Sequence, residues 1–126
     1  RRNHFDKLLE EVLAELPPSV LELLDTVPLI VDDQPSPAML REMELDHPGE
    51  LCGLYTGVPI NERSISSSGD LPDKISIFRL GIMELAQSIA GHDDDELRRQ
   101  IRLTILHEVG HHFGMSEDDL TEIGYD

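Results

Sequence analysis

One uninterrupted segment near the C-terminal end constrains the fold of this chain most. From Glu96 to Phe113 the sequence contains no proline, and its first glycine is Gly110. Such a run favours one long α-helix, because proline and glycine are the residues that most often interrupt helices. The aspartates at 93–95 precede it, and acidic residues in a first turn are stabilised by the positive end of the helix dipole.

The apolar residues of this segment predict which side of the helix is buried. At 100° per residue they fall on two adjacent stripes, Leu97–Ile101–Ile105–Val109 and Leu106–Gly110–Phe113. His107 and His111 lie on the far side of this apolar face, next to Gln100 and Thr104. The two histidines are four residues apart, so their side chains stack one helical turn above the other.

The residues 107–111 read H-E-V-G-H, which is the H-E-x-x-H spacing of zinc sites. Imidazole nitrogens bind zinc at about 2.0–2.1 Å, so His107 and His111 can share one ion without backbone strain. Glu108 is rotated off the ligand axis and can act as a general base on a water molecule without binding the metal itself. The sequence therefore predicts Zn²⁺ as cofactor, His107 and His111 as ligands, and Glu108 as the catalytic residue.

A third ligand is expected just after the helix. Gly114 permits a left-handed backbone that would end the helix, and a ligand can return three residues later, as in the longer H-E-x-x-H-x-x-G-x-x-H pattern. Glu117 occupies that position, and Asp118 is its alternative. Ser116 can cap a last short helix with Asp119 as the reciprocal capping residue. We expect His112 to be a partly buried, hydrogen-bonded histidine without a role at the metal.

The rest of the chain predicts further helices and strands around this segment. Apolar spacing indicates helices over Phe5–Leu16, from a Ser19 cap to Leu24, over Pro37–Glu44 and over Ile82–Ala90, the last ended by Gly91. Strands are expected at Val27–Val31, at Gly53–Ile60 and at Ile75–Phe78. Because Pro59 cannot donate to a sheet ladder, the Gly53–Ile60 strand is expected at a sheet edge. The stretch Ser64–Asp70 looks mobile.

Charge and cysteine content limit the kinds of partner and the cellular compartment that we expect for this protein. The net charge is −16, and binding to nucleic acid or to an anionic membrane surface requires basic clusters that this sequence lacks. No apolar run is long enough to span a membrane. Cys52 is the single cysteine, so we expect no disulfide framework and a small buried thiol. With an N-terminal segment unlike a signal peptide, these features predict a cytoplasmic protein.

The sequence resembles the short bacterial minimal zincin-like metallopeptidases. The likeness is carried by the stretch H-E-V-G-H-H-F-G-M-S-E-D-D-L, and it extends over the ranges 15–18, 27–31, 53–59, 62–64 and 71–75. The resemblance implies one α+β domain over residues 1–126, with a small mixed sheet packed beside the H-E-x-x-H helix. It also implies zinc held by His107, His111 and an acid at Glu117, with Glu108 catalytic.

Two functions follow as hypotheses. The first is a zinc metallopeptidase that acts on a peptide or protein substrate. We expect an extended substrate to lie along the Gly53–Ile60 edge, with Arg63 or Tyr125 as candidates for stabilising the oxyanion. The second is a non-proteolytic zinc-binding or partner-binding module that keeps the same site, because the short chain leaves little material for the walls of a cleft. We expect a monomer in either case. A purely structural zinc is disfavoured, since such sites are rich in cysteine.

Overall fold

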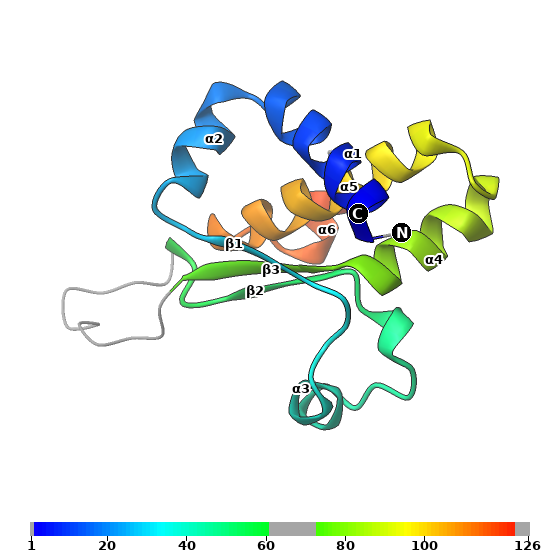
Figure 1. Cartoon of the computed structure of the whole chain (residues 1–126). Coiled ribbons are helices and arrows are strands. Elements are labelled where there is room, and N and C mark those ends of the chain that lie inside the picture. Colours follow the sequence, from blue (N-terminus) through cyan, green and yellow to red (C-terminus); the bar gives the residue numbers. More distant parts are fainter. Residues whose placement is uncertain (1, 61–72, 123–126) are drawn as a thin grey trace.

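The structure is a computed structural model that describes residues 2–60 and 73–122. These residues form six α-helices, one short 3₁₀ helix and three strands (Figure 1). In chain order they are α1 (Arg2–Glu15), α2 (Pro18–Leu24), β1 (Leu29–Asp32), α3 (Pro37–Glu42), η1 (Pro48–Glu50), β2 (Gly53–Thr56), β3 (Lys74–Phe78), α4 (Arg79–Ala90), α5 (Asp94–His112) and α6 (Glu117–Glu122).

Local signals account for most helix boundaries. Asp93 caps α5 through a hydrogen bond from the Asp95 N–H, and Gly91, at φ 62°, follows the last residue of α4 as expected. The prediction for the start of α2 is wrong. Its N-cap is Pro17 rather than Ser19, because Pro18 takes the first helical position, where the missing N–H costs no hydrogen bond.

The three strands form one mixed sheet in the order β1-β3-β2. β1 pairs with β3 in parallel, with Leu29 opposite Ile75, and β2 pairs with β3 antiparallel, with Leu54 opposite Ser76. Central β3 is buried from Ile75 to Phe78. The edge position predicted for the strand that begins at Gly53 is confirmed, although β2 ends at Thr56, four residues earlier than expected. Gly57 follows with φ 141°, outside the range of a regular strand.

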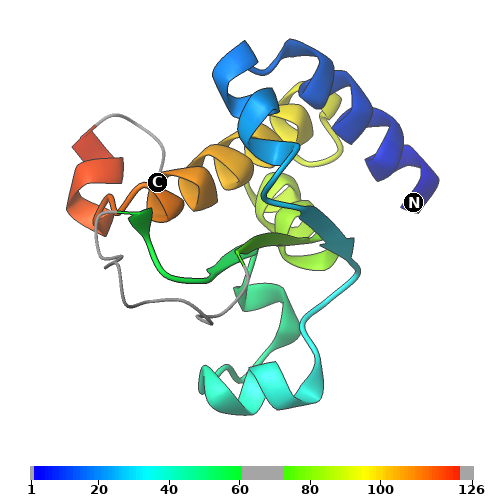
Figure 2. The same cartoon turned by 90° about the vertical axis from the view of Figure 1, so that its left-hand side faces the viewer.

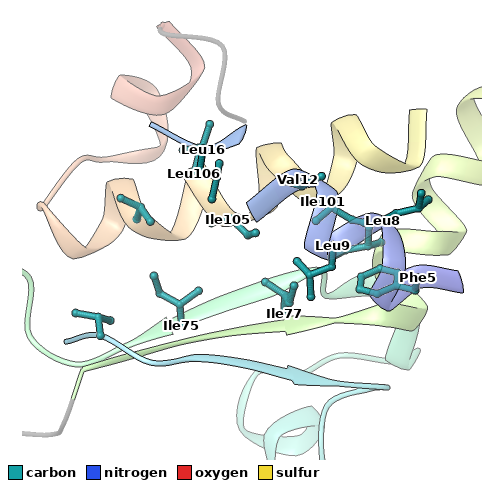
Figure 3. Packing of buried hydrophobic residues seen from close by; sticks show 13 residues of the cluster. Phe5, Leu8, Leu9, Val12, Leu16, Ile75, Ile77, Ile101, Ile105 and Leu106 are labelled. Atoms are coloured by element: carbon teal, nitrogen blue, oxygen red, sulfur yellow. The ribbon is translucent and has the colours of Figure 1, made fainter. Parts of the chain in front are cut away.

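The hydrophobic core lies between one face of this sheet and the helices α1 and α5 (Figure 3). Apolar side chains of α1 and α5, together with Leu16 just after α1, meet Ile75 and Ile77 of β3 there; those of the two helices include Phe5, Leu8, Leu9, Val12, Ile101, Ile105 and Leu106. α3 lies on the opposite side of the sheet, as both views show (Figures 1 and 2). A small mixed sheet packed beside α5 confirms the predicted α+β architecture.

Two apolar residues are more exposed than the sequence suggested. Phe113, placed on the second apolar stripe of the helix, is 51% exposed because it is the C-cap residue and has left helical geometry. Cys52 is half-buried at the margin of the core rather than fully buried. None of the helices in the described ranges combines the length and the apolar character that crossing a bilayer requires.

Candidate metal centre

Three side chains converge at the C-terminal end of α5. The Nε2 atoms of His107 and His111 lie 3.1 Å apart, and Glu117 Oε1 lies 3.1 Å from the first and 2.7 Å from the second. Among the described residues, this is the one group of three histidine, cysteine or acidic side chains whose ligand atoms gather closely enough for a metal ion. Asp118, the alternative third ligand, is not part of it.

The spacing of these three atoms fits a small tetrahedral cation. Two ligands bound to zinc at about 2.0–2.1 Å with a tetrahedral angle lie about 3.3 Å apart. Two of the observed separations, at 3.1 Å, are close to this value, and the 2.7 Å between His111 Nε2 and Glu117 Oε1 is shorter. His111 Nδ1 lies 3.1 Å from the carbonyl oxygen of Met115 and donates to it when it carries the ring proton, which leaves the Nε2 lone pair facing the group. Two imidazoles and one carboxylate are a ligand set that suits zinc.

The turn between α5 and α6 returns Glu117 to the two histidines. Gly114 has φ 84°, its N–H donates to His111 C=O at 2.9 Å, and the Met115 N–H donates to Gly110 C=O at 3.0 Å. This pair of bonds is the Schellman ending of a helix, which reverses the chain direction. Ser116 and Asp119 then cap α6 reciprocally, as predicted. The Ser116 N–H holds the pKa of the Asp119 carboxyl below its usual value.

Glu108 lies beside this group but is buried, with 7% of its surface exposed. Burial raises the pKa of its carboxyl, because desolvation disfavours the charged form. His107, His111 and a hydrogen bond from the backbone N–H of Tyr55 act in the opposite direction. The arrangement keeps a carboxylate basic and oriented within the site, which is the requirement for a general base.

Two depressions meet at His107 and Glu108. A cleft of about 630 Å³ extends toward α6 and is lined largely by apolar groups, among them Met43, Leu51, Leu54, Pro59 and Met115. A smaller pocket of about 240 Å³ extends toward the N-terminal part of α5, and it is lined by Cys52, Leu85, Gln100, Leu103 and Thr104 among others. Gly53 on edge strand β2 borders both. His107 and Glu108 therefore lie at the junction of the two depressions.

The family model described as zincin-like metallopeptidase matches residues 24–125. The chain belongs to the zincin-like metallopeptidase family. The match covers the sheet, α5 and the turn that carries Glu117, whereas α1 precedes it. No curated protein matches the chain.

For this zincin-like chain, the remaining sequence predictions have mixed outcomes. His112 is more buried than expected, at 3% exposure, and packs edge-to-face against Tyr55. Its Nδ1 lies 3.6 Å from Asp73 Oδ2, within ion-pair distance. Arg63, Tyr125 and the stretch 64–70 lie outside the described residues, so the predictions on them stay untested.

Sequence reasoning missed the groups that connect the edge strand to α5. The Tyr55 hydroxyl donates to Asp73 Oδ1 at 2.8 Å, and the backbone N–H of the same tyrosine reaches Glu108. A Cβ on Gly53 would lie 2.8 Å from Thr104 Cγ2 and 3.2 Å from Glu108 Cγ. No spacing rule links these residues, because they come from different elements. The lone glycine at the start of the predicted strand was the one signal of a close approach.

Proposed function

We propose that this protein is a zinc-dependent endopeptidase in which His107, His111 and Glu117 hold the ion and Glu108 is the general base. The observation that carries the proposal is the convergence of three ligand atoms beside a buried carboxylate, within a cleft bordered by a sheet edge. Family membership supports a metallopeptidase, and the geometry supports these particular roles.

Glu108 performs the proton transfers of the proposed reaction. Zinc bound by the three side chains would lower the pKa of a water molecule and polarise the carbonyl group of the scissile peptide bond. Glu108 accepts a proton from the water molecule while the water oxygen adds to the carbonyl carbon. Glu108 then delivers that proton to the nitrogen of the leaving amine as the C–N bond breaks. Burial suits the carboxylate to both steps, because it makes Glu108 a stronger base than an exposed glutamate.

Strand β2 is proposed to hold the substrate backbone. The Phe78 N–H donates to Cys52 C=O at 2.8 Å. Because hydrogen-bonded and non-hydrogen-bonded residue pairs alternate along antiparallel strands, Leu54, two residues further on, is also hydrogen-bonded to β3. The peptide groups of Gly53 and Tyr55 therefore point away from β3, and the Tyr55 N–H donates to Glu108. An extended peptide can pair with this edge strand and pass the convergent side chains, with main-chain hydrogen bonds giving affinity.

The experiment compares the parent protein with Glu108→Gln, using an unfolded casein as substrate and zinc content as the second readout. We expect casein cleavage that a chelator removes and zinc restores. Glu108→Gln should bind zinc as the parent does, yet lose activity by about 10²–10⁴-fold, the usual contribution of a general base.

Two further outcomes separate the alternatives. A zinc-loaded parent that cleaves no unfolded polypeptide would support the module hypothesis, in which the same site serves binding alone. Cleavage that persists in Glu108→Gln would remove Glu108 from the reaction. Loss of zinc from His107→Ala, with retention in a control histidine away from the site such as His47→Ala, would support the proposed ligand.

A further inference from the structure

Glu117, the proposed third ligand, lies on the short helix α6, which is not stable by itself. Glu117 is the first residue of α6, and its side chain is 71% exposed. α6 spans six residues, and isolated helices of that length do not persist in water. The position of Glu117 relative to the histidines must therefore come from a contact that attaches α6 to the rest of the molecule.

That contact is made by Leu120. It is the buried residue of α6, with no exposed surface, while its helix neighbours are exposed. Residues three apart lie on the same side of a helix, so burying Leu120 also turns Glu117 toward α5. Glu117 Oε1 accordingly reaches both histidines.

Gly110 provides the space that Leu120 occupies. A Cβ at position 110 would overlap Leu120 Cδ2 and would lie 3.5 Å from Met115 Sδ. Gly110 lies inside α5, where glycine is a poor helix former, so helix stability does not explain its presence. The absence of a side chain between His107 and His111 lets α6 approach the helix that carries them.

We propose that Gly110 and Leu120 are positioning residues that set the zinc affinity of the site by holding Glu117 over the two histidines. This inference rests on the proposed ligand role of Glu117. Neither residue has a side-chain atom that can bind the ion. Both act through the approach of α6 to α5.

The test measures zinc affinity by competition with a chromophoric chelator for the parent, Gly110→Ala and Leu120→Ala. Each substitution should weaken zinc binding by about 10–100-fold, the usual range for residues that orient a ligand. Glu122→Ala, an exposed substitution on the same helix, is the matched control and should leave the affinity unchanged. Circular dichroism of the metal-free proteins identifies any variant that fails to fold.

Repeating the substitutions in a Glu117→Ala background separates positioning from a general structural effect. If Gly110 and Leu120 act through Glu117, their effects should shrink to within about twofold once the carboxylate is absent. The double variant Gly110→Ala/Leu120→Ala should also lose less affinity than the product of the two single losses, because the new Cβ enters the space that Leu120 leaves.

Equal losses with and without Glu117 would overturn the inference, because the substitutions would then act on the histidines or on the whole fold. Unchanged affinity in both single variants would overturn it as well. The proposed peptidase function can fail separately. If the parent binds zinc through Glu117 but hydrolyses no casein, the positioning inference stands and the peptidase proposal is wrong. A parent protein that binds no zinc would overturn both.

Discussion

At the scale of single residues, Gly53 lies where strand β2 packs tightly against α5. A side chain there would meet Thr104 Cγ2 at 2.8 Å, Glu108 Cγ at 3.2 Å and the Ser76 carbonyl oxygen at 3.2 Å. Gly53→Ala should therefore displace Glu108 and reduce casein cleavage by up to about 10²-fold, the loss that misplacement of a catalytic group can cause. Zinc affinity should be unchanged, since the three proposed ligands are not among these contacts.

Thr104→Ser offers a rescue control for this prediction. Serine lacks the Cγ2 methyl group but keeps the hydroxyl, which donates to Gln100 C=O at 2.8 Å. The double variant Gly53→Ala/Thr104→Ser should recover much of the lost activity. If the double variant is as inactive as Gly53→Ala, the crowding explanation is wrong.

The sequence could predict the convergent residues because their relation is largely local. His107 and His111 are related by one helical turn, and Gly114 with Ser116 predicts the turn that returns Glu117. The ligand roles of these residues stay predictions until metal is measured. The Tyr55 N–H that reaches Glu108 could not be predicted in this way, because that contact depends on how β2 packs against α5.

At the scale of elements, Gly81 determines how closely α4 packs against the segment that leads into β2. A Cβ at Gly81 would overlap the Leu51 carbonyl oxygen and lie 3.3 Å from Cys52 Cα. Gly81→Ala should therefore destabilise the protein by about 1–3 kcal/mol, the usual cost of overpacking, although alanine is the better helix former. Urea unfolding of the two proteins measures the difference.

Gly49→Ala is the matched control for Gly81→Ala. A Cβ at Gly49 would meet the carboxylate end of Glu84 and the ring of His47, and both are exposed side chains that can move. Its effect on stability should be well below that of Gly81→Ala. Similar effects for both substitutions would show that the rigid backbone of Leu51 is not the cause.

Element boundaries were predictable where proline, glycine or a capping residue marks them. Pro37 begins α3, with Ser36 as its cap, and Gly91 follows α4 as predicted. The pairing of the strands was not predictable, because β1 and β3 are joined in parallel across more than forty residues that include β2. Hydrophobic alternation identifies a strand but does not identify its neighbour.

At the scale of the whole molecule, α1 belongs to the same core as the candidate site although the family match begins after it. Leu8 is 1% exposed and packs in the core that α5 also borders. Leu8→Ala should cost about 2–5 kcal/mol in the free energy of unfolding, measured with urea. The exposed Glu10→Ala on the same helix should cost little. A small effect of Leu8→Ala would indicate that α1 is detachable.

Arg79 links three parts of the molecule through charge. It donates to Asp6 of α1 at 2.9 and 3.2 Å and to Asp33 after β1 at 3.0 Å, and its side chain is only 11% exposed. Arg79→Met should lower stability by about 1.5–3 kcal/mol, the usual range for hydrogen bonds to charged groups, with the exposed Arg99→Met as control. Equal losses in both variants would contradict this role.

The same network predicts how stability depends on pH. Hydrogen bonding to Arg2, followed by Arg79, holds the pKa of the Asp33 carboxyl below its ordinary value of 3.8. A lowered pKa means that the stabilisation is complete above the ordinary value and is lost as the pH falls through the lower, folded-state value. Asp33→Asn should therefore be less stable than the parent at neutral pH, and the difference should disappear in strong acid.

The difference should be small, because half of the Asp33 side chain is exposed and water screens the ion pairs. Urea unfolding of both proteins from neutral pH to below 3.8 measures it, and Asp32→Asn at the exposed end of β1 is the neighbouring control. A gap between parent and Asp33→Asn that is constant over this range would mean that the lost contacts do not depend on the carboxylate charge. A gap that widens in acid would reverse the sign of the linkage and contradict the lowered pKa.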